Sequence, residues 1–136
     1  MRLVASLIAL AGLAAPAPPV LGEDARFSLC AELPYRTCVH NGDLIYLRGE
    51  SIRLADIVTP DRYASACPQA SNTAWYAAIR LRDLLNEGDF ELIEDPPGAD
   101  GERMAQLWRD GASLGDVLLN AGLAERRTAQ PPDWCD

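Results

Sequence analysis

The chain has 136 residues and a formal net charge of −8, from 20 acidic and 12 basic side chains, all of the latter arginine. This length suits one domain. The acidic balance excludes a protein that coats nucleic acid through a generally basic surface, so any contact with phosphate would depend on a few individual arginines.

The N-terminal 22 residues predict a secretory signal peptide. Arg2 precedes an apolar run at residues 3–15, and small residues and prolines follow up to Gly22. A basic start, a short apolar centre and a small-residue end are typical of such leaders, and the run is short for a membrane span. We expect cleavage after Gly22, which leaves residues 23–136 as the mature domain. An uncleaved N-terminal anchor is the alternative.

Alternating hydrophobicity and turn residues predict strands in two groups. Asn41-Gly42 is a strong hairpin signal, and Gly49-Glu50 marks another tight turn. The first strand is expected in two pieces, divided by a turn-like segment around Pro34. The predicted strands cover residues 27–30 with 37–40, 44–48, 51–58, 90–94 and 103–109.

Two segments have helical periodicity. The first, residues 71–86, has an apolar stripe that includes Trp75, with Ser71 or Asn72 as the cap. The second, residues 113–121, begins with a Ser-x-x-Asp pattern at Ser113. Together the elements predict an α+β domain, a five-stranded OB-like Greek-key β-barrel with two helices.

The sequence contains an even number of cysteines, namely Cys30, Cys38, Cys67 and Cys135. In a small exported domain this number indicates two disulfides and a periplasmic or secreted location. A zinc site is the competing interpretation. A zinc site is disfavoured because the sequence has no Cys-x-x-Cys pair and only one histidine, His40.

Three motifs in the predicted meander, in this order and spacing, resemble the thermonuclease-like (staphylococcal nuclease-like) family. They are Val39-His40-Asn41-Gly42-Asp43-Leu44, Ile52-Arg53-Leu54 and Val58-Thr59-Pro60-Asp61. The Phe-x-x-Cys start at residues 27–30 and the Trp-Cys end at residues 134–135 resemble its exported bacterial subgroup. Later segments extend the resemblance at residues 98–105, 110–111 and 118–124. The match covers residues 27–135, and it implies the barrel fold and calcium-dependent cleavage of phosphodiesters in DNA or RNA.

The resemblance also implies roles for individual residues. Asp43 matches a calcium-binding aspartate, and the carbonyl of Thr59 matches a second calcium ligand. Arg53 matches an arginine that stabilises the phosphate, since a forked guanidinium suits its developing charge. Asp61 takes the place of the glutamate that handles the attacking water, although its side chain is one methylene shorter. Structural roles in a hairpin turn or a local ion pair remain open for these residues.

Two positions depart from the family pattern. Val58 stands where a second calcium-binding aspartate is expected, and Glu102 stands where a second arginine is expected. Arg103 is the next residue and could act in place of that arginine, but alternation along a strand predicts that it points to the other face. We therefore expect nuclease activity to be impaired or absent, with the domain retained for binding or structure. A weak or active calcium-dependent nuclease that uses Arg103 is the alternative.

The same reasoning gives expectations for ligands and cysteine pairing. Calcium is expected only if the protein is active, nucleic acid or nucleotides would bind weakly, and the mature chain would be a monomer without membrane contact. If the barrel brings both termini to one side, Cys30 would pair with Cys135 and Cys38 with Cys67.

Overall fold

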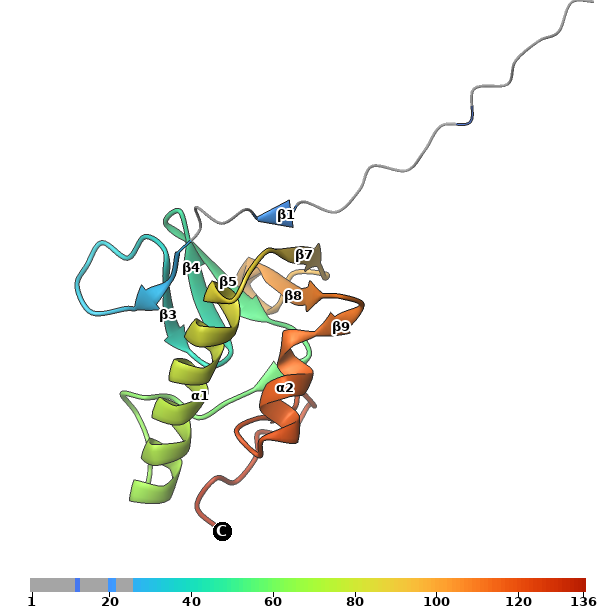
Figure 1. The fold of residues 1–136 in the computed structure, drawn as a ribbon. Coiled ribbons are helices and arrows are strands. Elements are labelled where there is room, and N and C mark those ends of the chain that lie inside the picture. Colours follow the sequence, from blue (N-terminus) through green and yellow to red (C-terminus); the bar gives the residue numbers. More distant parts are fainter. Residues whose placement is uncertain (1–11, 13–19, 22–25) are drawn as a thin grey trace, which may run out of the picture.

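A computed structural model describes residues 26–136 and, before them, residues 12, 20 and 21. The predicted signal peptide, residues 1–22, therefore lies almost entirely outside the described residues. The protein has an α+β architecture with two α-helices and a mixed sheet (Figure 1). No helix in the described part of the chain is long and apolar enough to cross a membrane.

The elements follow one another in the order that the sequence predicts. The helices are α1 (Pro68–Asn86) and α2 (Leu114–Asn120), with a 3-10 turn η1 (Ala99–Gly101). The strands are β1 (Val20–Leu21), β2 (Ser28–Leu29), β3 (Cys38–Asn41), β4 (Leu44–Leu47), β5 (Glu50–Leu54), β6 (Ile57–Val58), β7 (Phe90–Glu94), β8 (Met104–Arg109), β9 (Ala112–Ser113) and β10 (Glu125–Arg126).

The main sheet has the strand order β1-β7-β8-β5-β4-β3-β2, and β9 pairs with β8. Strands β3, β4 and β5 form the predicted antiparallel meander, while β5 and β8 are parallel, with Arg53 opposite Met104. Among the described residues no ladder joins β7 to β3, so the expected closed barrel is not present. At the two edges, β2 pairs with the outer edge of β3, and β1, which lies within the predicted signal peptide, pairs with that of β7.

The third predicted strand is interrupted. β5 ends at Leu54, and the chain bends before β6, which leaves the main sheet and pairs with β10 of the C-terminal tail. Val58 lies opposite Glu125 in this small ladder. The tail thus lies beside the start of the motif Val58-Thr59-Pro60-Asp61. The functional site described below depends on this position of the tail.

Helix α1 begins earlier than the sequence indicates. Its N-cap is Cys67, whose sulfur accepts a hydrogen bond from the Ala70 amide, and Pro68 follows in the first turn, where it needs no donor. Neither Ser71 nor Asn72 is the cap. In α2, by contrast, Ser113 caps as predicted, since its hydroxyl accepts from the Gly115 amide.

One hydrophobic core lies between the sheet and the two helices. Helix α1 packs against β2 and β3, and α2 packs against β8 (Figure 1). The stripe on α1 supplies Leu81 and Leu85 to this core, but Trp75 of the predicted stripe is 41% exposed and lies on the surface. The largest fully buried side chains are Ile45, Ile52, Leu54, Ile57, Leu81, Leu107, Leu118 and Val39.

The disulfides are Cys30–Cys38 and Cys67–Cys135, so the expected pairing of Cys30 with Cys135 and of Cys38 with Cys67 is wrong. Strand β2 runs parallel to β3, and the amide of Cys30 donates to the carbonyl of Val39, which brings Cys30 next to Cys38. The tail does not return to the N-terminal strands as the barrel argument assumed. It ends beside the start of α1 instead, where Cys67 is within reach.

Candidate functional site

Asp43 is the centre of a buried polar cluster. Its side chain is 3% exposed, and it is the second residue of the Gly42-Asp43 turn between β3 and β4. Gly42 brings this turn against α1, because a Cβ at this position would lie 2.6 Å from the Cβ of Ala77 and 2.8 Å from Cγ2 of Thr59. The close approach removes the Asp43 carboxylate from solvent, so it needs partners within the protein.

Three side chains donate to this carboxylate. The Thr59 hydroxyl donates to Oδ1 over 3.2 Å, and Nη1 of Arg53 donates to Oδ2 over 3.3 Å. Nη2 of Arg127 donates to Oδ2 over 3.2 Å. The structure thus brings together Asp43, Arg53 and Thr59 as the motifs predict, and it adds Arg127, which the sequence analysis did not single out.

Arg127 connects the C-terminal tail to the turn between β5 and β6. Its Nη2 also donates to the carbonyl oxygens of Leu54, at 3.0 Å, and Ile57, at 2.7 Å. Its own amide donates to the carbonyl of Asp56. No local pattern could have identified this residue, because its partners are about 70 and 84 positions away in the sequence.

Arg53 is held on its other side by Glu102. The Arg53 Nε donates to Oε1 of Glu102 over 2.7 Å. Burial alone lowers the pKa of Arg53, but the hydrogen bond to Glu102 and the charges of Asp43 and Glu102 raise the pKa above its ordinary value. The guanidinium of Arg53 is thus paired with two carboxylates, and its fork is not directed at a free phosphate position.

The electrostatics of Asp43 follow from its burial. Burial raises the pKa of the Asp43 carboxyl above its ordinary value, because desolvation disfavours the charged form. The charges of Arg53 and Arg127 and the hydrogen bonds from Thr59 oppose this rise without cancelling it. The two guanidinium groups are therefore what allows an ionised carboxylate at this position.

The other two predicted catalytic residues lie outside the cluster. Asp61 is exposed, and its Oδ1 accepts from the amide of Tyr63 over 2.8 Å in a local turn. Arg103 lies directly before β8 and donates to Glu50 over 2.6 Å and to Glu94 over 2.9 Å. Its neighbour Glu102 accepts from Arg53 instead, so the two side chains point in opposite directions, as alternation along an extended backbone predicts. The structure does not bring Arg103 and Arg53 to one pocket.

The residues around Asp43 do not suit a calcium ion. Calcium takes six to eight oxygen ligands, usually with several carboxylates. Here one carboxylate is shared by two guanidinium groups, Val58 has no side-chain oxygen and Asp61 is turned away. No group of three or more acidic, histidine or cysteine side chains in the described residues is arranged to hold a metal ion.

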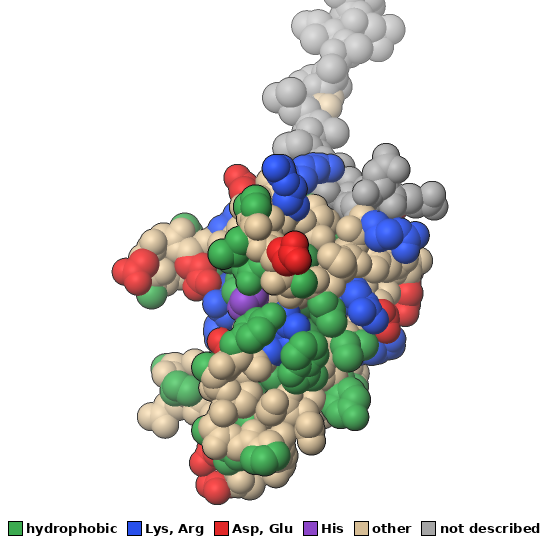
Figure 2. Space-filling model, turned by 90° about the vertical axis from the view of Figure 1, so that its left-hand side faces the viewer, with side chains coloured by type: hydrophobic (Ala, Val, Ile, Leu, Met, Phe, Trp, Pro, Cys, Tyr) green, Lys and Arg blue, Asp and Glu red, His purple; other side chains and the backbone are tan. Residues whose placement is uncertain are grey.

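A further arginine, Arg62, is buried for a structural reason. Its Nε donates to the carbonyl of His40, and its guanidinium lies 4.9 Å from the ring centre of Tyr63 and 4.7 Å from that of Trp75. Figure 2 shows hydrophobic side chains around the histidine and an arginine on this face. Burial and the charge of Arg62 lower the pKa of His40. Arg62 is enclosed by its partners and leaves no fork for a phosphate.

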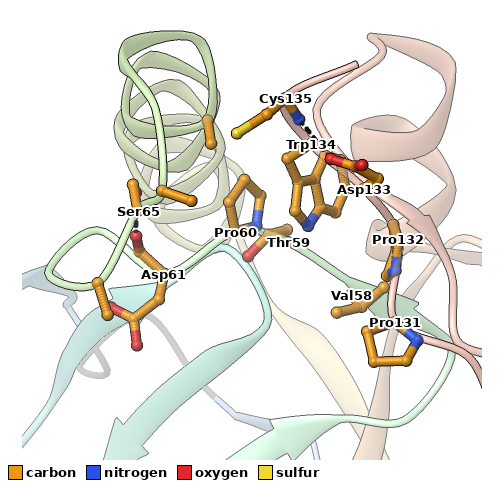
Figure 3. A pocket seen from close by; sticks show the side chains of 13 residues that line it. Val58, Thr59, Pro60, Asp61, Ser65, Pro131, Pro132, Asp133, Trp134 and Cys135 are labelled. Atoms are coloured by element: carbon orange, nitrogen blue, oxygen red, sulfur yellow. Dashed lines mark hydrogen bonds between the residues drawn. The ribbon is translucent and has the colours of Figure 1, made fainter.

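A cavity of about 300 Å³ lies next to the Asp43 cluster, between residues 58–61 and the C-terminal tail (Figure 3). Its walls come from residues 58–61, from residues 64–66 with Ala70, and from residues 131–135. The Cys67–Cys135 disulfide ties the third wall to the start of α1. Thr59 belongs to both the Asp43 cluster and the cavity wall, whereas Asp43, Arg53, Glu102 and Arg127 do not line the cavity.

Comparison with protein-family models gives no match, and comparison with curated proteins gives none either. The resemblance to the thermonuclease-like family therefore rests on the motifs in this chain. The two disulfides are compatible with a periplasmic or extracellular location.

Proposed function

We propose that this protein is an exported thermonuclease-like domain that has little or no nuclease activity and is retained as a binding or structural domain. The observation that carries the proposal is the contact of Arg127 with Asp43, at 3.2 Å. A cationic side chain sits on the carboxylate that the resemblance assigns to calcium. An internal guanidinium supplies the positive charge there, without the open ligand positions that a catalytic ion needs.

Two further features support the loss of hydrolysis. Arg53 is paired with Glu102, so a phosphate that approached Arg53 would be repelled by the Glu102 carboxylate. Asp61 is held in a surface turn by the amide of Tyr63 and does not reach the cluster. Removal of one donor to a transition state typically costs about 10² to 10³ in rate, and here several groups are absent together.

The finer description of the fold is part of the proposal. The order β3-β4-β5-β8-β7 places the first, second, third, fifth and fourth main strands side by side. The parallel contact between β5 and β8, and a helix between the third and fourth strands, also support an OB-like Greek-key arrangement. OB-folds are known to bind oligonucleotides and oligosaccharides, and one fold can host many unrelated functions.

The alternative is a weak calcium-dependent phosphodiesterase. It is favoured by one observation, namely that Asp43, Arg53 and Thr59 still meet within hydrogen-bonding distance. This set would have to work with a metal that displaces Arg127, and without Arg103, which is paired with Glu50 and Glu94.

Cleavage of DNA and RNA with and without calcium, together with calcium titration by calorimetry, decides between the two. The native protein is expected to show neither calcium-dependent cleavage nor calcium binding. A variant with Val58→Asp, Asp61→Glu, Glu102→Arg and Arg127→Leu is expected to gain calcium affinity. Calcium-dependent cleavage by the native protein that Asp43→Ala abolishes would overturn the proposal.

A further inference from the structure

The cavity beside the tail has the size and lining of a small-molecule site. Its volume of about 300 Å³ lies at the lower end of the range for ligand pockets, and most of its lining is apolar. The apolar side chains come from Val58, Pro60, Ala64, Ala66, Ala70, Pro131, Pro132 and Trp134. A compact ligand with an apolar body would bury its surface against them.

The charged side chains that line the cavity are both acidic. They are Asp61 and Asp133, which lie on opposite sides in Figure 3, and no arginine lines the cavity. One oxygen of each carboxylate accepts a hydrogen bond from a backbone amide, Tyr63 for Asp61 and Cys135 for Asp133. These bonds fix the orientation of both groups at the rim.

The charge of these groups selects the ligand. The hydrogen bond from the Cys135 amide, followed by one with Asp136, lowers the pKa of Asp133 and so favours its charged form. The whole chain has a net charge of −8, which repels anions at long range. The indole of Trp134 adds an aromatic face, which attracts organic cations.

We propose that this cavity binds small organic ammonium ions, with the apolar body against Trp134 and the prolines and the ammonium group at the carboxylate rim. The site shares Thr59 with the Asp43 cluster but uses other charged groups, and it goes beyond the proposed function. It would exist whether or not the protein cleaves phosphodiesters. Anionic nucleotides, in contrast, are disfavoured there by both carboxylates.

NMR titration of the full chain with three probes of similar shape tests this proposal. The probes are 2-phenylethylammonium, the neutral 2-phenylethanol and the anionic 3-phenylpropionate. We expect the ammonium probe to bind about tenfold more tightly than the neutral one, with the anion weakest. Shifts should be largest at the Trp134 indole and the amides of residues 59–66 and 131–135.

Paired variants separate the specific site from general attraction to an acidic protein. Asp61→Asn with Asp133→Asn should remove the preference for the ammonium probe and leave the neutral probe bound as before. Asp100→Asn with Asp110→Asn makes the same change in net charge away from the cavity and should leave the preference intact. Both control positions have positive φ, which asparagine tolerates.

Three results would overturn the proposal. The first is equal affinity for all three probes, and the second is no binding of any of them at millimolar concentration. The third is an equal effect of the two pairs of variants. These outcomes are independent of the cleavage assay, so failure of this site and failure of the proposed function can be told apart.

Discussion

Replacement of Arg127 by methionine tests the role of the tail arginine directly. Methionine keeps much of the apolar stem and removes the guanidinium. The nitrogen that is lost serves three acceptors, namely the Asp43 carboxylate and the carbonyl oxygens of Leu54 and Ile57. Asp43 remains buried, with Arg53 as its one charged partner.

The magnitude follows from these contacts. Hydrogen bonds with a charged partner contribute about 1.5 to 3 kcal/mol, and removal of one partner from a buried ion pair costs about 3 to 5 kcal/mol. Since Arg53 and Thr59 still donate to Asp43, we expect Arg127→Met to lower the free energy of unfolding by about 2 to 3 kcal/mol at neutral pH.

The pH dependence has a definite sign. The pKa of Asp43 is already raised in the folded state, so its ionised form costs stability above that pKa. Loss of the Arg127 charge raises the pKa further. The deficit of the variant should therefore be largest at neutral pH, and it should shrink as the pH falls through the raised pKa and Asp43 takes up a proton.

Urea unfolding at several pH values measures this effect, with Arg126→Met as the matched control. Arg126 is the neighbouring residue, and its ion pair with Asp116 is solvent-exposed. It should cost no more than about 0.5 kcal/mol. In an Asp43→Asn background the cost of Arg127→Met should fall by about 1 kcal/mol or more. Equal losses of unfolding free energy for Arg127→Met and Arg126→Met, or a loss that does not change with pH, would contradict the role of Arg127 as a partner of buried Asp43.

Two further predictions concern the elements that hold the cluster in place. Gly42→Ala should lower the free energy of unfolding by about 1 to 3 kcal/mol, because the new Cβ meets Ala77 and Thr59; an unchanged urea midpoint would contradict the close approach. The double change Cys67→Ser and Cys135→Ser should cost about 4 kcal/mol, since this disulfide closes a separation of 68 residues. A loss below 1 kcal/mol on the same curves would show that the tail contributes little to the fold.

Local signals made part of this structure predictable. The β3–β4 hairpin, the Ser113 cap and the opposite directions of residues 102 and 103 each depend on neighbouring residues. The cap and the opposite directions are found as expected. The hairpin is also found, but its two turn residues are Gly42 and Asp43 rather than Asn41 and Gly42. A short-range preference needs no knowledge of the rest of the chain.

Long-range partners were not predictable in the same way. The pairing of Cys67 with Cys135 depends on where the tail runs, and the contact of Arg127 with Asp43 depends on the same path. The cap of α1 by Cys67 was missed because sulfur is not among the preferred capping atoms. The contact between Asp43 and Thr59 was easier to predict. Both residues belong to the motifs of one meander, and short-range turn signals define that meander.

The small ladder between β6 and β10 has a consequence for the substitutions that position 58 can accept. Val58 lies opposite Glu125, two residues before Arg127. An aspartate at position 58 would therefore face a second carboxylate, and like charges directly opposite each other destabilise a pair of strands. Loss of Arg127 would leave Asp43 without its second cation. Each of these single steps toward a calcium site costs stability before any ion could compensate, so the present arrangement resists them one at a time.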